Sequence, residues 1–234
     1  MKPLAEQLRP KDLTQYLGQE HLVGQNGALR KSLQIGRLPS IILWGPPGVG
    51  KTTLALLLAK ELDAPLYTLS AVNSGVKDVR EVLATAEKKN LFDTKRPILF
   101  IDEIHRFNKG QQDSLLHAVE RGYITLIGAT TENPSFEINA ALLSRMQVYV
   151  LNPHNVQDLS SMIDLANDIP YAQEHDLKIT AHEFLIKQSV GDARKLYNLI
   201  ELCFQQGKEG VEIDEIFAKN ILSNAQIRYD KGGD

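Results

Sequence analysis

The sequence predicts an α/β fold, in which a parallel sheet flanked by helices is followed by a small all-α domain. Five short β-rich runs occur before Pro153, helical stretches separate them, and no further strong strand follows. Such alternation is typical of a parallel sheet covered on both faces. We therefore expect a core domain at residues 1–152 and a helical lid domain at residues 153–234.

Each element of the core domain has its own signal. The strands are apolar runs rich in β-branched and aromatic residues, expected at residues 41–44, 66–69, 98–101, 124–130 and 148–151. The helices are expected between them, at residues 52–62, 76–89 and 109–120, with a short one at residues 139–144. No internal repeat or low-complexity tract interrupts this order.

Capping residues mark the helices of the second domain. Side chains that accept hydrogen bonds from a helix's first N–H groups precede each apolar stretch, and glycines follow two of them. The expected caps are Asn155, a Thr180–Glu183 capping box, Asp192 and Asp214, and the expected stops are Gly191 and Gly207.

Composition narrows the function classes. The 234 residues are 43% hydrophobic and 24% charged, which is ordinary for a globular protein. No run approaches the length of a membrane span and the start lacks a signal peptide's apolar core, so we expect a cytoplasmic protein without membrane partners. The net charge of −3 argues against general positive attraction to nucleic acid, and the single Cys203 excludes an internal disulfide.

The stretch LWGPPGVGKTT, residues 43–53, carries the strongest chemical signal. It matches the phosphate-binding pattern G-x-x-x-x-G-K-[ST] between a strand and a helix, where backbone N–H groups and the helix N-terminus surround phosphates. Lys51 would reach the β- and γ-phosphates, and the Thr52 hydroxyl would hold Mg²⁺. The expected contacts to the nucleotide triphosphate are Gly45, Pro46, Pro47, Gly48, Val49, Gly50, Lys51, Thr52 and Thr53.

A second motif, ILFIDE, indicates hydrolysis. Asp102 and Glu103 end a buried strand, at the edge where ligands bind in open α/β sheets. We expect Asp102 to join the Mg²⁺ site and Glu103 to polarise a water for attack on the γ-phosphate.

Three further residues have two interpretations each. Arg145 and Arg194 have the context of cations that stabilise phosphoryl transfer, and both are equally consistent with surface ion pairs. Thr130, at the end of a strand, could orient the attacking water or serve as a turn hydroxyl.

The segment after the carboxylates, HRFNKGQQD, is a possible DNA contact. Arg106 and Lys109 could meet phosphates, or they are solvated surface charges. We favour Phe107 as a core residue, with Asn108 and Gln111 as a capping pair. His105 and His117 are interpreted as polar fillers because no metal-ligand cluster accompanies them.

These motifs together resemble a known family. GPPGVGKT, ILFIDE, LIGATT, LLSR and GDAR, in this order, are similar to the five signatures of an AAA+ ATPase of the clamp-loader clade. The longer strings IDEIHRFNKGQQD and IGATTENPSFEINAALLSR resemble the replication-associated recombination protein A (RarA, or MgsA) family, from about Leu4 to the end. This resemblance implies a P-loop AAA+ fold, ATP as the nucleotide, Thr130 as sensor 1, Arg145 as an arginine finger towards a neighbouring subunit, and Arg194 as sensor 2.

The resemblance also implies a function. The members of the family are DNA-dependent ATPases that act at replication forks and in recombination and repair, and single-strand-binding protein is a partner. By this resemblance we expect a nucleoid-associated location. The members of the family continue beyond the segment RYDKGGD into a further helical region that supports tetramer formation. We expect this chain to lack that region, so the oligomeric state of this chain stays open. The alternatives are a clamp-loader subunit, a Holliday-junction branch-migration motor, or a non-hydrolysing nucleotide-dependent assembly module.

Overall fold

The chain folds into two compact units. The structure is a computed structural model that describes residues 2–90 and 95–231. An α/β unit spans Pro10–Asn152, and a helical unit contains the described residues from Pro153 on. Residues 2–9 belong with the helical unit, so the expected core domain of residues 1–152 is corrected at its start. The reason is local packing, because helix α1 (Leu4–Gln7) lies against α12 (Ala193–Gln206) with Leu4 buried.

A five-stranded sheet forms the centre of the α/β unit. Its strands, all at or within one residue of the expected positions, are β1 (Ile41–Trp44), β2 (Leu66–Ser70), β3 (Ile98–Asp102), β4 (Thr125–Thr130) and β5 (Gln147–Val150). The order is β2-β3-β4-β1-β5, and every pairing is parallel. The predicted parallel sheet is thus confirmed.

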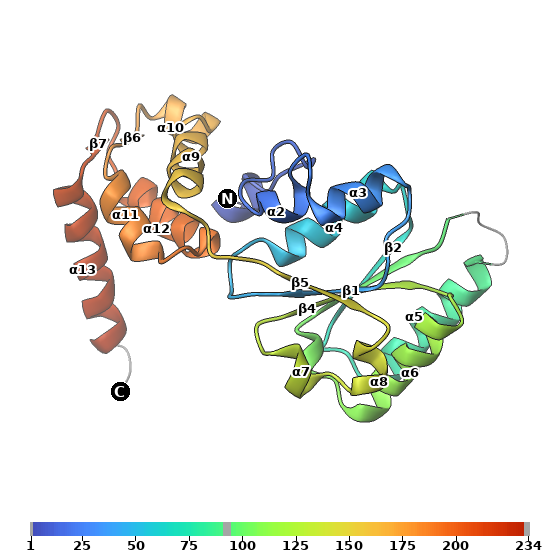
Figure 1. Cartoon of the computed structure of the whole chain (residues 1–234). Helices are drawn as coiled ribbons and strands as arrows, with labels where there is room; N and C mark the ends of the chain where they lie inside the picture. The colour runs from blue at the N-terminus through green and yellow to red at the C-terminus, as the bar shows by residue number, and fades with distance from the viewer. Residues whose placement is uncertain (1, 91–94, 232–234) are drawn as a thin grey trace. The chain divides into compact units, whose positions relative to one another are not determined.

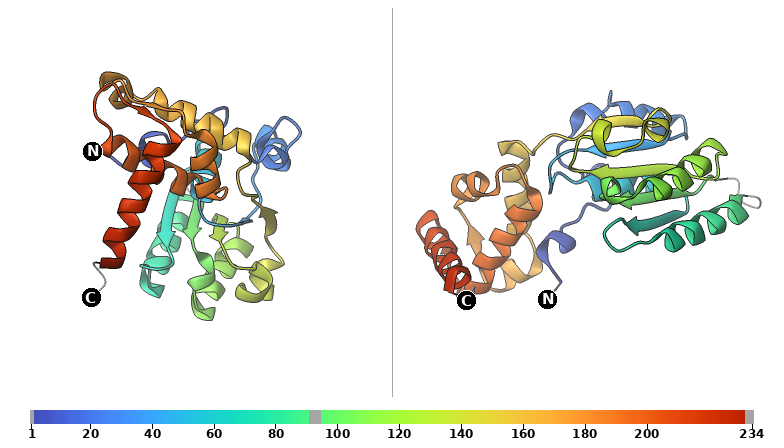
Figure 2. Two further views of the ribbon diagram at one scale, coloured as in Figure 1. Left: turned by 90° about the vertical axis from the view of Figure 1, so that its left-hand side faces the viewer. Right: turned by 90° about the horizontal axis from the view of Figure 1, so that it is seen from below.

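Helices cover both faces of this sheet (Figure 1; Figure 2). On one face lie α2 (Glu20–Val23), α3 (Ala28–Gln34) and α4 (Lys51–Glu61). On the other lie α5 (Val76–Asn90), α6 (Lys109–Glu120), α7 (Pro134–Glu137) and α8 (Ala140–Leu143). Successive strand residues point to opposite faces. Ile41 and Leu43 therefore pack with the α4 leucines, while Ile42 packs against α5 and α6.

The helical unit differs from the all-α expectation in one respect. Its helices are α9 (Val156–Asn167), α10 (Pro170–Glu174), α11 (His182–Ser189), α12 and α13 (Glu215–Lys231). Two short strands, β6 (Lys178–Ile179) and β7 (Glu212–Ile213), pair in parallel beside them. Strands of two residues are too short to show an alternating pattern in the sequence, which is why they were not predicted.

Most of the expected caps are confirmed. The Asn155 side chain accepts a hydrogen bond from Asp158 N in a capping box, Asp192 accepts from Lys195 N, and Asp214 accepts from Phe217 N. The Thr180–Glu183 capping box is wrong. Helix α11 begins only at His182, because the N–H groups of residues 180 and 181 both donate to Ile213 O and extend the small sheet instead.

The helices show no membrane span. Across residues 2–90 and 95–231, no helix is both long enough and apolar enough to cross a bilayer.

Candidate functional site at the carboxyl edge of the sheet

Strand register brings the two principal motifs to one edge. Trp44, the last residue of β1, pairs with Thr130, the last residue of β4, and Gly45 N donates to Thr130 O at 3.2 Å. The neighbouring strand β3 ends at Asp102. All three strands are parallel, so the phosphate loop and the carboxylates emerge on the same side of the sheet.

The loop between β1 and α4 requires glycine at two positions. A side chain at Gly45 would place Cβ 2.4 Å from the backbone oxygen of Leu151. Gly50 has a left-handed φ of 91°, and a Cβ there would lie 2.7 Å from the Tyr16 hydroxyl. Helix α4 begins at the next residue, so its free N–H groups face the loop. This geometry fits a phosphate group.

Tyr16 supports the loop from behind. Its side chain is buried, and its hydroxyl donates towards Val49 O at 3.4 Å and Gly50 O at 3.3 Å. Burial raises the pKa of this phenol well above its ordinary value, so it stays a neutral donor. Sequence inspection did not single out Tyr16.

Lys51 is the buried cation of the site. Its side chain is 7% exposed, and Nζ donates to Gly45 O at 2.7 Å and Pro46 O at 2.8 Å. A lysine is rarely this buried without a structural or functional reason. The ammonium group is therefore fixed within the loop, where a phosphate would meet it.

The expected metal-binding residues lie on the two elements that meet at this edge. Thr52 is in the first turn of α4 and Asp102 ends β3, and both are partly buried. Within the described residues, no group of three or more His, Cys, Asp or Glu side chains is arranged to hold a metal by itself. Two oxygen ligands suit Mg²⁺, which usually completes its shell with phosphates and water.

Glu103 has an unusual backbone. Its φ of 54° and ψ of 45° are left-handed, and the short helix η1 (Ile104–Arg106) follows directly. Such a conformation costs a non-glycine residue about 1–3 kcal/mol and is concentrated at functional sites. Its carboxylate Oε2 lies 3.2 Å from His105 Nδ1 and accepts a 3.4 Å hydrogen bond from Thr131 Oγ1.

Thr130 and Thr131, adjacent at the end of β4, have different contacts. Thr130 is fully buried, and its hydroxyl forms a turn with the backbone of Glu132 and contacts His105. Thr131 is the threonine that contacts the Glu103 carboxylate. Sequence inspection missed Thr131, although the doubled threonine after the strand was the available signal.

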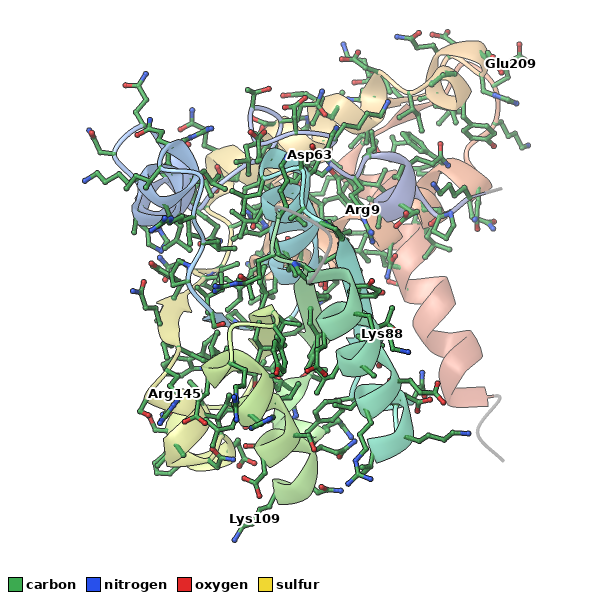
Figure 3. The ribbon with its side chains drawn as sticks, turned by 90° about the vertical axis from the view of Figure 1, so that its right-hand side faces the viewer. Arg9, Asp63, Lys88, Lys109, Arg145 and Glu209 are labelled. Atoms are coloured by element: carbon green, nitrogen blue, oxygen red, sulfur yellow. The ribbon has the colours of Figure 1, made fainter. Side chains whose placement is uncertain are left out.

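The two candidate arginines lie in different units. Arg145 follows α8, pairs with Glu120 Oε1 at 2.6 Å, and donates to Ala141 O and Ser144 Oγ. It is well exposed, and Figure 3 shows it on the side of the α/β unit that carries α8. Arg194 is exposed in the first turn of α12, in the helical unit. The α/β unit by itself therefore holds the loop and carboxylates but not Arg194.

The segment proposed to contact DNA is partly structural. Phe107 is 3% exposed and packs in the core, and Asn108 and Gln111 form a capping box, both as predicted. Arg106 and Lys109 are exposed. In Figure 3 the Lys109 side chain extends away from the start of α6, so it is free of the core.

Comparison with known proteins identifies the family. Residues 41–154 match the ATPase family associated with various cellular activities (AAA), and residues 172–234 match the AAA C-terminal domain. The first match contains the loop and the carboxylate edge, and the second contains Arg194. The chain contains an AAA domain followed by an AAA C-terminal domain. The AAA+ fold predicted from the sequence, with its following helical domain, is confirmed.

Relatives of this AAA chain have replication-associated names. It is 44% identical to replication-associated recombination protein A of Haemophilus influenzae, over 99% of this chain and 53% of the relative. It is 41% identical to the ATPase WRNIP1 of Dictyostelium discoideum, over 99% of this chain and 29% of that protein. The predicted similarity to replication-associated recombination protein A is confirmed. The chain spans about half the length of the curated bacterial relatives that it matches.

A solved structure of a DNA motor has the same AAA fold. The RuvB Holliday junction branch migration motor of Thermotoga maritima superimposes with a TM-score of 0.75 at 29% identity. The alignment covers 92% of this chain and 72% of the motor. It therefore includes parts of both units, and not the sheet alone.

Proposed function

We propose that this AAA chain binds ATP with Mg²⁺ and hydrolyses it, as a DNA-dependent ATPase of replication-fork maintenance, recombination and repair. The observation that carries the proposal is the convergence of the Lys51 loop with Asp102 and Glu103 at one edge of the sheet. The names of the relatives support the biological setting. By the same reasoning we expect a cytoplasmic, nucleoid-associated location.

Each residue at the edge has a proposed task. The backbone N–H groups of residues 45–53 and the Lys51 ammonium bind the phosphates, and Thr52 with Asp102 holds the metal. When bound, ATP would supply an electrophilic phosphorus, and Mg²⁺ would neutralise the charge that develops on the phosphate oxygens. The Glu103 carboxylate orients a water and accepts its proton, and Thr131 assists by fixing that carboxylate.

The arginines complete the site in this proposal. Arg145 serves as an arginine finger for a neighbouring copy, and Arg194 serves as sensor 2. Both side chains are exposed, which is consistent with these roles because neither is held in the core of its own unit. Thr130, expected as sensor 1, has its hydroxyl engaged with Glu132 and His105, so we assign it an indirect role.

DNA is the proposed partner. Single-stranded or forked DNA would contact the exposed Arg106 and Lys109, and each phosphate contact would make the affinity depend on salt. Single-strand-binding protein is a second proposed partner, and a homo-oligomer is required for Arg145 to act on a neighbour's ATP. Membranes play no part in the proposal.

The central experiment compares wild-type protein with Glu103→Gln. The amide keeps the size of the side chain and one acceptor oxygen, but it accepts no proton. We expect turnover to fall by about 100-fold or more, with ATP affinity unchanged within about threefold. Turnover is measured by phosphate release, and affinity by a fluorescent ATP analogue. Equal turnover in both proteins contradicts the role of Glu103, and no turnover in either favours a non-hydrolysing assembly module.

A mixing experiment tests whether Arg145 acts across an interface. Glu103→Gln and Arg145→Ala are each expected to be nearly inactive. Mixed subunits create some sites with an intact Glu103 and a neighbour's intact Arg145, so activity should return in the mixture. Wild-type turnover per subunit should also rise with protein concentration and with added forked DNA. A mixture as inactive as its components contradicts catalysis across the interface.

A branch-migration motor is the second candidate function, favoured by the structural likeness to RuvB. It predicts ATP-dependent movement of a synthetic four-way junction, measured by strand separation on a gel. A clamp-loader subunit predicts instead ATP-dependent binding to a sliding clamp. Stimulation by forked DNA without either activity supports the leading proposal.

A further inference from the structure

His105 lies between the proposed catalytic carboxylate and the end of β4. Its Nδ1 is 2.9 Å from Thr130 Oγ1 and 3.2 Å from Glu103 Oε2. The imidazole is 13% exposed and the threonine is fully buried, so water competes little for these contacts. Sequence inspection interpreted His105 as a polar filler, but these contacts place it beside the base of the proposed reaction.

The hydrogen-bond pattern determines which atom carries the proton. A threonine hydroxyl has one donor and two acceptor positions. Thr130 donates its proton to Glu132 O at 3.2 Å and accepts from Glu132 N at 3.0 Å. An acceptor position remains for His105, and Glu103 Oε2, 3.2 Å from the same nitrogen, only accepts when the carboxylate is ionised, so we assign Nδ1 as the donor. The neutral imidazole is therefore the Nδ1–H tautomer, whose proton also faces the Glu103 carboxylate.

We propose that His105 is a positioning residue for Glu103. Thr130 fixes the tautomer and the ring, and the ring's Nδ1–H holds the carboxylate that accepts the water's proton. Glu103 needs this because its side chain is 30% exposed and has several rotatable bonds. Misplacement of a base by about 1 Å lowers a rate strongly. The inference rests on the proposed function. It implies that Thr130 affects the rate of hydrolysis through His105, without itself contacting the attacking water.

Two substitutions of His105 with similar polarity distinguish positioning of Glu103 from a role in packing alone. The side-chain nitrogen of asparagine lies where Nδ1 lies in histidine, whereas that of glutamine lies closer to Nε2. We expect His105→Asn to keep kcat within about threefold of wild type and His105→Gln to lower it about 10-fold. ATP affinity and KM should stay unchanged in both, because neither group contacts nucleotide in this scheme.

Thr130 gives an independent test of the same chain of contacts. Thr130→Ser keeps the hydroxyl and should keep kcat, whereas Thr130→Val removes the acceptor and should lower kcat about as much as His105→Gln. The double variant Thr130→Val/His105→Gln should be little slower than either single one, because both break one pathway. Multiplicative losses would overturn the proposed dependence of Thr130 on His105.

The closing experiment distinguishes failure of this inference from failure of the proposed function. Turnover of wild type, Glu103→Gln, His105→Asn and His105→Gln is measured together. At pH 8, ¹⁵N NMR reads which nitrogen of His105 carries the proton. A wild-type rate no higher than that of Glu103→Gln overturns the proposed function. An active wild type with equal rates for the Asn and Gln variants, or an Nε2–H tautomer, overturns the role of His105 alone.

Discussion

The α/β unit and the helical unit place their polar groups by different means. In the α/β unit, Lys51 at the start of α4 and Thr130 at the end of β4 are both buried, and the backbone is left-handed at nearby Gly50 and Glu103. In the helical unit, exposed polar side chains such as Asn155 and Asp214 cap helices. In the α/β unit, strained backbone holds polar side chains at the proposed site. In the helical unit, polar side chains stabilise the ends of helices. Substitutions in the α/β unit should therefore impair function most.

The largest effect is expected at Lys51. Lys51→Met removes the buried ammonium and should weaken ATP binding about 100-fold, because charge-assisted hydrogen bonds to phosphate are lost. Lys60→Met is the matched control, since Lys60 is exposed in the last turn of the same helix. Titration with a fluorescent ATP analogue measures both. A similar loss in the two variants would remove the distinction between a buried site group and a surface charge.

A glycine pair tests the strain in the phosphate loop. Gly50→Ala and Gly36→Ala both force alanine into a left-handed conformation, but only at Gly50 does the new Cβ meet the Tyr16 hydroxyl. We expect a loss of about 2 kcal/mol in the free energy of unfolding for Gly50→Ala, and about 1 kcal/mol for Gly36→Ala. Urea denaturation measures both.

The double variant Tyr16→Phe/Gly50→Ala identifies the cause of the extra loss. Removing the hydroxyl takes away the atom nearest to the added Cβ, so part of the stability should return. Equal losses at Gly50 and Gly36 would show that φ alone matters, and that Tyr16 does not constrain the loop.

Arg194 tests whether the helical unit contributes to the site at all. Arg194→Ala should lower turnover about 10-fold if the arginine stabilises the transferring phosphate, with no change in thermal stability. Lys195→Ala is the control, because it removes an exposed cation from the adjacent position in the first turn of α12. Equal turnover in the two variants would confine the chemistry to the α/β unit.

The sequence predicted features that depend on contiguous residues. It did not predict contacts between residues that are far apart in the chain. The phosphate loop was predicted residue by residue because its chemistry lies in one contiguous stretch. The contacts of Glu103 were not, because they depend on a left-handed backbone and on the register of β4 beside β3. Placement of residues 2–9 was also missed, since it rests on packing such as the hydrogen bond from Leu4 N to Glu201 Oε2, 197 residues away.

The smallest effect is expected at His154, a buried histidine of the helical unit. Burial is the main cause that lowers the pKa of His154 below 6.5, and nearby Asp158 and Asp192 only partly oppose it. The folded state thus favours the neutral ring, while the unfolded chain takes up a proton near pH 6.5. The stabilising contribution is therefore complete above about pH 6.5 and is lost as the pH falls from there through the lowered pKa of the folded state.

His154→Gln tests this because it cannot titrate. Between pH 7 and pH 5, its thermal unfolding midpoint should fall less than that of wild type, as followed by circular dichroism. His175→Gln is the control, since His175 is exposed in the same unit and should behave like wild type. If the unfolding midpoint of His154→Gln follows the same pH dependence as that of wild type, the buried His154 makes a negligible contribution to the loss of stability at low pH. The helical unit would then resemble an ordinary helix bundle with its polar groups at the surface, and the contrast with the α/β unit would be sharper.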